Sequence, residues 1–302
     1  MFENILGNEK NKKILERAIE LNKASHSYIF WGTEGIGKQL IAKQFAKAIL
    51  CIDNKEKNCT CKSCIEILSD NNPDFQLIGA DDGKIKIEQI REMQRKVAEK
   101  PIISNKKVYI INDADKMTTE AQNCLLKTLE EPPEYITIIL VASNENSLLS
   151  TIKSRCTRIH FEPIENEKIK EYLKENYSQE NINETIINLS QGSIGKVIKL
   201  LEHKELYENL ENILKNLQNK DLIDIVQMSE EIYKSKEEIN SILEYINVLA
   251  LNLSKKNIRY IRCIDIIEET KKRLKANSNY DMCIDNMLFN VWEEVNEKNN
   301  RG

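Results

Sequence analysis

The segment GTEGIGKQ, residues 32–39, has the residue types and spacing of a phosphate-binding loop. In such a loop, backbone N–H groups at a helix N-terminus surround the phosphates, and a lysine reaches the outer ones. Gly32, Gly35 and Gly37 would supply a permissive backbone, and Lys38 would supply the charge. An apolar run precedes the segment and an amphipathic stretch follows it. This context favours a P-loop over a chance glycine-rich turn.

The residues that would handle magnesium and water depart from this motif. A Ser or Thr after the lysine ordinarily holds Mg²⁺, but this chain has Gln39 there. In the segment KVYIINDADKM, residues 107–117, Asn112 and Asp113 stand where an Asp-Glu pair would hold the metal and polarise the attacking water. Phosphoryl transfer depends on charge neutralisation by Mg²⁺, so we expect no ATP hydrolysis by this chain. Nucleotide binding stays open, since the loop and Lys38 remain.

A cysteine cluster is the second candidate site. The segment CIDNKEKNCTCKSC, residues 51–64, holds four of the eight cysteines, and four thiolates can bind zinc tetrahedrally. The predicted ligands are Cys51, Cys59, Cys61 and Cys64. The Cys59-x-Cys61 step is one residue shorter than Cys-x-x-Cys and would strain a tetrahedron, so free thiols in an exposed loop are the alternative. Zinc here would fold the loop rather than catalyse. The other cysteines are predicted to be small core residues: Cys124, Cys156, Cys263 and Cys283.

Strand and helix patterns alternate over residues 1–160, which predicts a doubly wound α/β domain. Apolar β-branched or aromatic runs without strict alternation are typical of buried parallel strands; they cover residues 27–31, 74–79, 107–112 and 136–143. Amphipathic helices are predicted between them over residues 38–50, 86–100 and 119–131. Thr119 with Gln122 fits a capping box for the last helix, and Pro132 ends it.

Helical patterns alone follow residue 164. We predict a small helical unit and then a bundle of five helices, over residues 207–217, 220–234, 236–256, 261–277 and 279–298. The predicted domains are an α/β core over 1–163 with the cysteine insertion at 51–64, a helical lid over 164–205, and a helical domain over 206–302.

Composition excludes some classes of protein. The net charge of −4 argues against a globally basic nucleic-acid binder. No run of about 18 apolar residues could span a membrane, and residues 1–13 lack the apolar core of a signal peptide. With cysteines that we expect to be reduced, these features predict a cytoplasmic protein.

Four segments in a fixed order resemble the AAA+ clamp-loader subunits of bacterial DNA polymerase III. They are HSYIFWGTEGIGK (26–38), KVYIINDADKM (107–117), CLLKTLEEPP (124–133) and STIKSRC (150–156). The resemblance implies a RecA-like AAA+ core, a small helical lid and an all-α collar that assembles a five-subunit ring. Within this family the sequence is most similar to the delta-prime type, which accompanies an ATP-hydrolysing tau/gamma subunit and a delta subunit. The resemblance also implies a zinc module at the cysteine cluster.

The resemblance implies roles for further residues. Arg155 matches the arginine finger that a non-hydrolysing stator donates to the ATP site of a neighbouring tau/gamma subunit, a role that suits a guanidinium; an ordinary surface arginine is the alternative. Ser143 or Asn144 lies where a sensor-1 residue would meet the γ-phosphate. Gly195, followed by Lys196, takes the sensor-2 place at which active subunits carry an arginine.

The implied partners are tau/gamma and delta, and through the complex the sliding clamp and primed DNA. Two competing hypotheses stay open. One is an active AAA+ ATPase with a degenerate P-loop, and the other is a recombination or repair protein of the same class.

Overall fold

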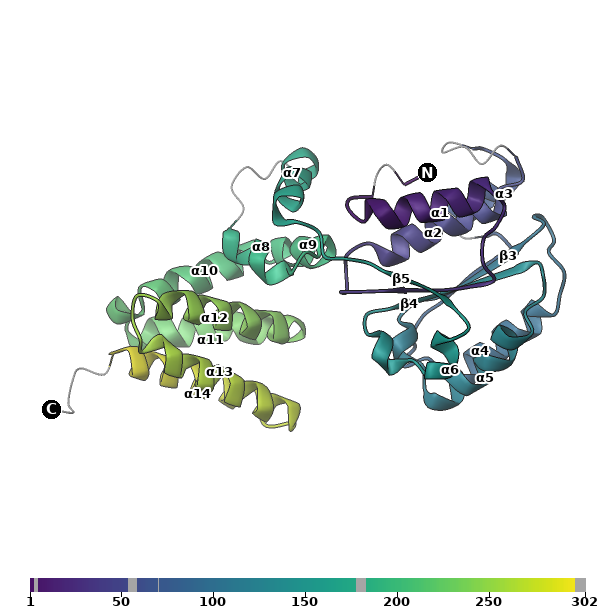
Figure 1. The fold of residues 1–302 in the computed structure, drawn as a ribbon. Helices are drawn as coiled ribbons and strands as arrows, with labels where there is room; N and C mark the ends of the chain where they lie inside the picture. Colours follow the sequence, from purple (N-terminus) through teal and green to yellow (C-terminus); the bar gives the residue numbers. More distant parts are fainter. Residues whose placement is uncertain (3–4, 54–58, 70, 178–182, 297–302) are drawn as a thin grey trace. The chain divides into compact units, whose positions relative to one another are not determined.

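The computed structural model describes residues 1–2, 5–53, 59–69, 71–177 and 183–296. The chain divides into two compact units, which we describe separately (Figure 1). The first consists of Met1–Tyr177 with Gly192–Gly195, and the second of Ser178–Gln191 with Lys196–Gly302. The three predicted domains stay a prediction. Parts of each lie outside the described residues, namely 3–4, 54–58 and 70 in the core, 178–182 in the lid and 297–302 at the end of the last predicted helix.

A five-stranded parallel sheet forms the centre of the first unit, with the order β2-β3-β4-β1-β5. Its strands are β1 (Ser27–Trp31), β2 (Phe75–Ile78), β3 (Lys107–Ile111), β4 (Ile136–Ala142) and β5 (Thr157–His160). The four predicted strands are confirmed to within one residue at each end. The sequence pattern did not reveal β5, because in this short edge strand only Ile159 is buried.

Helices cover both faces of this sheet (Figure 1). Tyr28 and Phe30 of β1 pack into one hydrophobic cluster with α1 and α2, whereas Ile29 points into the other cluster with α4 and α5. This alternation along one strand is what a doubly wound sheet requires, and it confirms the predicted α/β core. The helices of the unit are α1 (Glu9–Glu20), α2 (Lys38–Leu50), α3 (Lys62–Leu68), α4 (Ile87–Val97), α5 (Thr119–Glu130), α6 (Ser150–Lys153) and α7 (Asn166–Tyr177), with 3₁₀ turns η1 (Ala114–Lys116) and η2 (Glu145–Ser147).

The predicted cap of α5 was wrong by one residue. Thr118, not Thr119, is the N-cap, and its hydroxyl accepts a hydrogen bond from the Ala121 N–H at 3.3 Å. A threonine side chain reaches the N3 amide only from the position before the first helical residue.

The second unit is helical. The five predicted helices correspond to α10 (Lys204–Lys215), α11 (Leu222–Lys234), α12 (Ile239–Ser254), α13 (Tyr260–Lys275) and α14 (Tyr280–Asn296), which confirms the predicted helical C-terminal region. Their core includes a contact between Tyr207 and Tyr245, whose ring centroids are 4.7 Å apart. The remaining elements are α8 (Glu184–Ser190), η3 (Leu217–Asn219), η4 (Lys236–Glu238) and α9 (Ile194–Glu202), whose first two residues belong to the first unit. None of the helices among the described residues is both long and apolar enough to cross a bilayer.

Candidate functional site

The phosphate loop connects the carboxyl end of β1 to the N-terminus of α2, where a P-loop must lie. Gly32 has φ of 145°, and a Cβ there would lie 2.2 Å from the carbonyl oxygen of Phe161, the residue after β5. Gly37 is the N-cap of α2 with φ of 92°. Both positions therefore need glycine, because any residue with a side chain would be strained there. These two glycines give the loop its backbone shape.

Lys38 is folded against its own loop. Its Nζ donates hydrogen bonds to the carbonyl oxygens of Gly32 and Thr33, both at 2.7 Å, and only 5% of the residue is exposed. Burial lowers the pKa of Lys38, while the nearby carboxylates of Asp115 and Glu34 act in the opposite direction. Two of the three ammonium protons are therefore used within the loop, which leaves one for an outer phosphate.

The metal-handling positions are near the loop but offer little to a divalent cation. Gln39 is half-buried in the first turn of α2. Asn112 follows β3 and has a neutral amide. Asp113 adopts a left-handed backbone with φ of 54°, and its Oδ2 is 3.2 Å from Lys116 Nζ. The pKa of Lys116 is raised because it is bonded to Asp113. Of Asn112 and Asp113, the one carboxylate is therefore already paired with a lysine of the same turn.

Sequence reasoning missed Asp115, which lies closer to the centre of this site. Its Oδ1 accepts a hydrogen bond from the Ser143 N–H at 3.1 Å, so it links η1 to the end of β4. Among the carboxylates near Lys38, it has the largest effect on the lysine pKa. The sequence feature that could have indicated Asp115 is its position two residues after Asp113 in the same acidic segment.

The two sensor positions differ in their surroundings. Ser143 is half-buried beside Asp115, whereas Asn144 is exposed and caps η2 through the Asn146 N–H. Gly195 belongs to the first unit, and its N–H donates to the Gly35 carbonyl oxygen at 3.1 Å. A Cβ at position 195 would lie 3.3 Å from Gly35 Cα, so a side chain there would press on the phosphate loop. Lys196 instead pairs with Glu244 at 2.7 Å, within the second unit.

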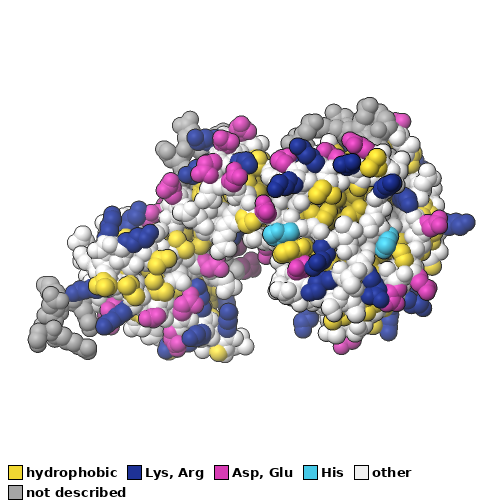
Figure 2. Space-filling view, in the orientation of Figure 1, with side chains coloured by type: hydrophobic (Ala, Val, Ile, Leu, Met, Phe, Trp, Pro, Cys, Tyr) yellow, Lys and Arg dark blue, Asp and Glu magenta, His cyan; other side chains and the backbone are white. Residues whose placement is uncertain are grey.

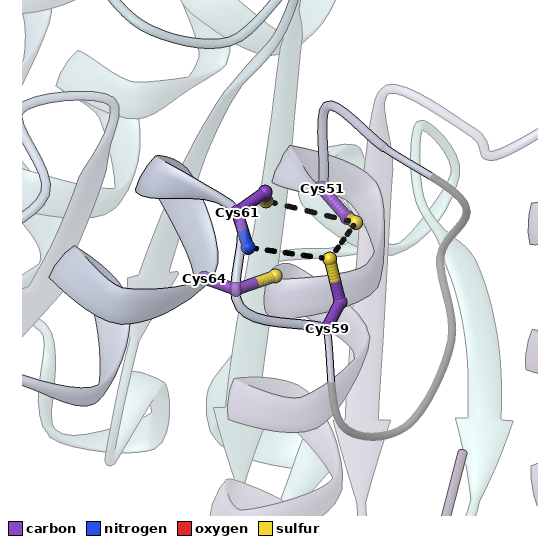
Figure 3. A group of neighbouring side chains, drawn as sticks. All are labelled: Cys51, Cys59, Cys61 and Cys64. Carbon is purple, nitrogen blue, oxygen red and sulfur yellow. Dashed lines mark hydrogen bonds between the residues drawn. The ribbon is translucent and has the colours of Figure 1, made fainter.

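The structure brings the four predicted zinc ligands together (Figure 3). Cys51 follows the end of α2, Cys61 caps α3 and Cys64 lies in its first turn. All four Sγ atoms are within 4.8 Å of one another, with Cys51 Sγ 3.6 Å from Cys59 Sγ and 4.0 Å from Cys61 Sγ. Zn–S bonds of about 2.3 Å in a tetrahedron place sulfurs about 3.8 Å apart. The cluster therefore fits a zinc ion, and the short Cys-x-Cys step does not prevent this.

The charge balance of the cluster also favours a cation. Burial raises the pKa of Cys64 well above its usual range. Burial acts in the same direction on Cys61, but hydrogen bonds from the backbone N–H groups of Cys64 and Ile52 lower the pKa of Cys61 to about 7. Neighbouring thiols thus do not ionise together without a compensating charge. A bound zinc would supply that charge and hold all four as thiolates.

Arg155 is the second residue after α6 on the first unit, and about one-third of its side chain is exposed (35%). Its Nη2 is 2.8 Å from Glu130 Oε1, and its Nη1 donates to the Thr151 carbonyl oxygen at 3.0 Å. Glu130 ends α5. The guanidinium is therefore held at two points and still faces solvent on one side.

Figure 2 shows one face of both units, on which Lys and Arg side chains are interspersed with Asp and Glu. The face drawn carries no single continuous basic surface. This distribution agrees with the net charge of −4.

A parallel sheet of this order with a phosphate loop after β1, followed by helices, defines a RecA-like core of the AAA+ class. The family described as "DNA polymerase III, delta subunit" matches residues 7–165, which is 159 of the 302 residues. The chain belongs to this family, and the resemblance to bacterial clamp-loader subunits is confirmed.

Known relatives agree with this assignment. The delta-prime subunit of DNA polymerase III from Bacillus subtilis is 33% identical over 67% of this chain and 62% of its own length. The gamma/tau subunit of Mycoplasma pneumoniae is 36% identical over 67% of this chain but only 30% of its own length. The fold is also similar to a crystal structure of a DNA polymerase III gamma-subunit-related protein from Thermotoga maritima. The alignment covers 93% of this chain and 99% of the Thermotoga chain, with 18% identity and a TM-score of 0.53. At that identity the likeness shows a shared fold alone.

Proposed function

We propose that this chain acts as a delta-prime-type subunit of the DNA polymerase III clamp loader. In this role it does not hydrolyse ATP, and it supplies Arg155 to the ATP site of a neighbouring tau/gamma subunit. The complex would load the sliding clamp onto primed DNA. The observation that carries the proposal is the contrast within one site: the phosphate loop keeps its glycines and Lys38, while Gln39, Asn112 and the Lys116-paired Asp113 replace the metal- and water-handling residues.

The absence of hydrolysis follows from the charges. Phosphoryl transfer depends on Mg²⁺ to neutralise the developing negative charge and on a carboxylate or amide to orient water. Gln39 has no hydroxyl for the metal, and Asn112 has no charge. Asp113 is one methylene shorter than the usual glutamate and is already bonded to Lys116. A nucleotide in this loop would therefore lack the groups that activate its γ-phosphate.

Two features of Arg155 favour its use in trans: its side chain is partly exposed, and neighbouring groups fix its orientation. A finger must be charged at all pH values, must reach beyond its own surface, and must be held with little freedom. Arg155 is partly exposed, and Glu130 and the Thr151 carbonyl oxygen fix its orientation. Its phosphate-facing role, like the roles of Ser143 and Gly195 as altered sensor positions, is part of the proposal.

The remaining parts of the proposal concern organisation. Cys51, Cys59, Cys61 and Cys64 would bind one structural zinc ion, the region over 164–205 would act as a lid, and the helices over 206–302 would form the collar that joins tau/gamma and delta. A cytoplasmic location follows from a role in replication and stays a prediction.

Reconstitution with the tau/gamma and delta subunits of the same organism tests the proposal. The isolated chain should turn over no ATP above background, and it should co-assemble into a complex whose ATPase depends on it. Turnover by the isolated chain that Lys38→Ala abolishes would support an active ATPase instead. Failure to assemble with tau/gamma and delta would favour a recombination or repair protein.

A further inference from the structure

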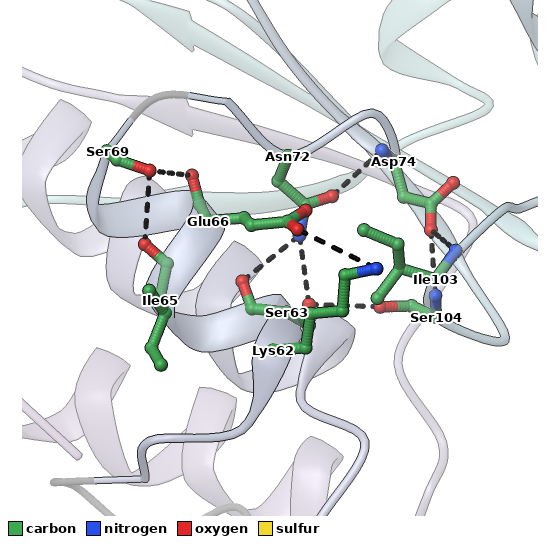
Figure 4. A network of polar contacts seen from close by, with 9 residues as sticks. All are labelled: Lys62, Ser63, Ile65, Glu66, Ser69, Asn72, Asp74, Ile103 and Ser104. Carbon is green, nitrogen blue, oxygen red and sulfur yellow. Dashed lines mark hydrogen bonds and ion pairs between the residues drawn. The ribbon is translucent and has the colours of Figure 1, made fainter.

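A chain of buried hydrogen bonds connects residues that are next to two of the predicted zinc ligands in sequence, and Figure 4 shows its side chains. It joins Asn72, Ser63 and Ser104 to the carbonyl oxygen of Leu50. Ser63 is 0% exposed, Asn72 4% and Ser104 8%. Leu50 directly precedes Cys51, and Ser63 directly precedes Cys64. These hydrogen bonds therefore connect the sequence neighbours of two of the four cysteines, Leu50 at the end of α2 and Ser63 in α3.

The direction of these hydrogen bonds is determined by the number of protons. The Ser104 hydroxyl donates its one proton to Leu50 O at 2.6 Å, so it must accept from the Ser63 hydroxyl at 3.1 Å. Ser63 in turn accepts from Asn72 Nδ2 at 3.0 Å, and the same amide nitrogen donates to the Ser63 carbonyl oxygen at 3.1 Å. Each hydroxyl thus donates once and accepts once. Aligned donors of this kind polarise one another in a buried setting, so breaking one link weakens the rest.

The far end of the chain is fixed to the sheet. The Asp74 carboxylate, which is 2% exposed, accepts hydrogen bonds from the backbone N–H groups of Ile102, Ile103 and Ser104 at 2.7–2.8 Å. The Asp74 N–H donates to Asn72 Oδ1 at 2.8 Å. Asp74 directly precedes β2, so the loop that carries Ser104 is anchored to the edge of the sheet.

From this geometry we infer that the Asn72–Ser63–Ser104 chain positions the cysteines for zinc, with Ser104 as the residue that joins both sides. Cys51 follows the end of α2, and Cys61 and Cys64 are at the start of α3. The hydrogen bonds through Ser104 hold these two helix ends at a fixed distance from each other. A preset separation reduces the ordering that zinc binding must impose, as outer hydrogen bonds do at metal sites. This inference rests on the proposed zinc site and concerns none of the residues proposed to act on ATP.

Metal titration of the purified, reduced full-length chain tests the inference. Zn²⁺ affinity is measured against a chromophoric chelator, and Co²⁺ is added separately because its visible absorption reports tetrahedral thiolate ligation. Ser104→Ala should weaken Zn²⁺ binding on the order of tenfold, the lower end of what outer-shell changes cause at metal sites. Ser69→Ala is the matched control, since Ser69 directly follows α3 and its exposed hydroxyl bonds to Ile65 O and Glu66 O of that helix.

Two further variants separate positioning from general destabilisation. Ser104→Thr keeps the hydroxyl and should restore most of the affinity. Ser63→Ala should cost about as much as Ser104→Ala, and the double variant little more than either, because one break interrupts the chain. Equal affinities for Ser104→Ala and Ser69→Ala would overturn the inference, even if Ser104→Ala unfolds more easily. If the wild-type chain bound neither Zn²⁺ nor Co²⁺, the zinc site itself would be wrong, while the proposal about Arg155 would stand.

Discussion

Arg155 Nη2 lies 2.8 Å from Glu130 Oε1, so the last residue of α5 meets the second residue after α6. This pair joins the LEEPP segment to the SRC segment, which are separated by some twenty residues in sequence. Because both side chains are partly exposed, with 35% and 48% of their area accessible, the pair orients the guanidinium more than it stabilises the fold.

Removing the charge of Glu130 tests that reading. Exposed ion pairs contribute about 0.2–1 kcal/mol, so Glu130→Gln should lower the stimulated ATPase of the reconstituted complex by no more than about fivefold. The thermal midpoint of the isolated chain should fall by no more than a few degrees. Glu131→Gln, at the exposed neighbouring position, is the control and should have no effect on either measurement. A loss as large as that of Arg155→Ala would mean that Glu130 does more than orient its partner.

Lys38 should matter for folding but not for turnover. In Lys38→Ala the carbonyl oxygens of Gly32 and Thr33 lose a buried donor, which costs about 1–3 kcal/mol of unfolding free energy. Urea unfolding measures this cost, and Lys13→Ala on the exposed side of α1 is the control. The ATPase of complexes assembled from folded Lys38→Ala chain should match wild type. A selective loss of turnover at full stability would contradict our account of this loop.

The cysteine cluster should hold one zinc ion per chain. Elemental analysis of the reduced protein should give this ratio, and Cys64→Ser should lose the metal because three thiolates leave the tetrahedron incomplete. Cys124→Ser should retain it, since Cys124 is in α5 and bonds to Gln94 instead. Metal-free protein purified under reducing conditions, with all four thiols titratable, would remove the zinc proposal.

Cys156 should react slowly in the folded chain despite its partial exposure. Burial raises the pKa of Cys156 to about 11, so at pH 8 its thiolate fraction is about 200-fold below that of an ordinary thiol with a pKa of about 8.5. The raised value favours the protonated thiol in the folded state. Its contribution to stability is therefore complete below about pH 8.5 and is lost as the pH rises towards 11.

Alkylation followed by mass spectrometry measures this difference. Iodoacetamide at pH 8 should modify Cys156 much more slowly in the native chain than in the same chain unfolded in urea. Equal rates in the two states would show that the thiol is not shielded.

Sequence patterns predicted the sheet because its central strands are continuous apolar runs. All seven residues of β4 and all five of β3 are buried, for example. The pattern failed for β5, where one buried residue in four gives no periodicity. It also failed at Thr118, because two adjacent threonines fit the same cap and only the backbone decides between them.

The sequence predicted which residues form the candidate sites, but it did not predict all of the contacts between them. The spacing of Cys59 and Cys61 indicated strain, yet the turn into α3 brings their sulfurs within reach of Cys51. Nothing in the spacing indicated that Asp115 reaches Ser143 or that Glu130 holds Arg155. These two pairs join different elements, so they depend on the tertiary fold. Asp113 and Lys116, by contrast, lie three residues apart in one turn.

The central claim is tested most directly by ATP hydrolysis in a reconstituted complex in which this chain alone carries Arg155→Ala. A trans arginine is worth on the order of 10³ in rate or more at the site it serves, so single-turnover hydrolysis should lose the contribution of the adjoining ATP site, with assembly intact. Arg158→Ala, an exposed arginine on β5 paired with Glu145 at 3.8 Å, should behave as wild type. Unchanged hydrolysis with Arg155→Ala in a fully assembled complex would contradict the account.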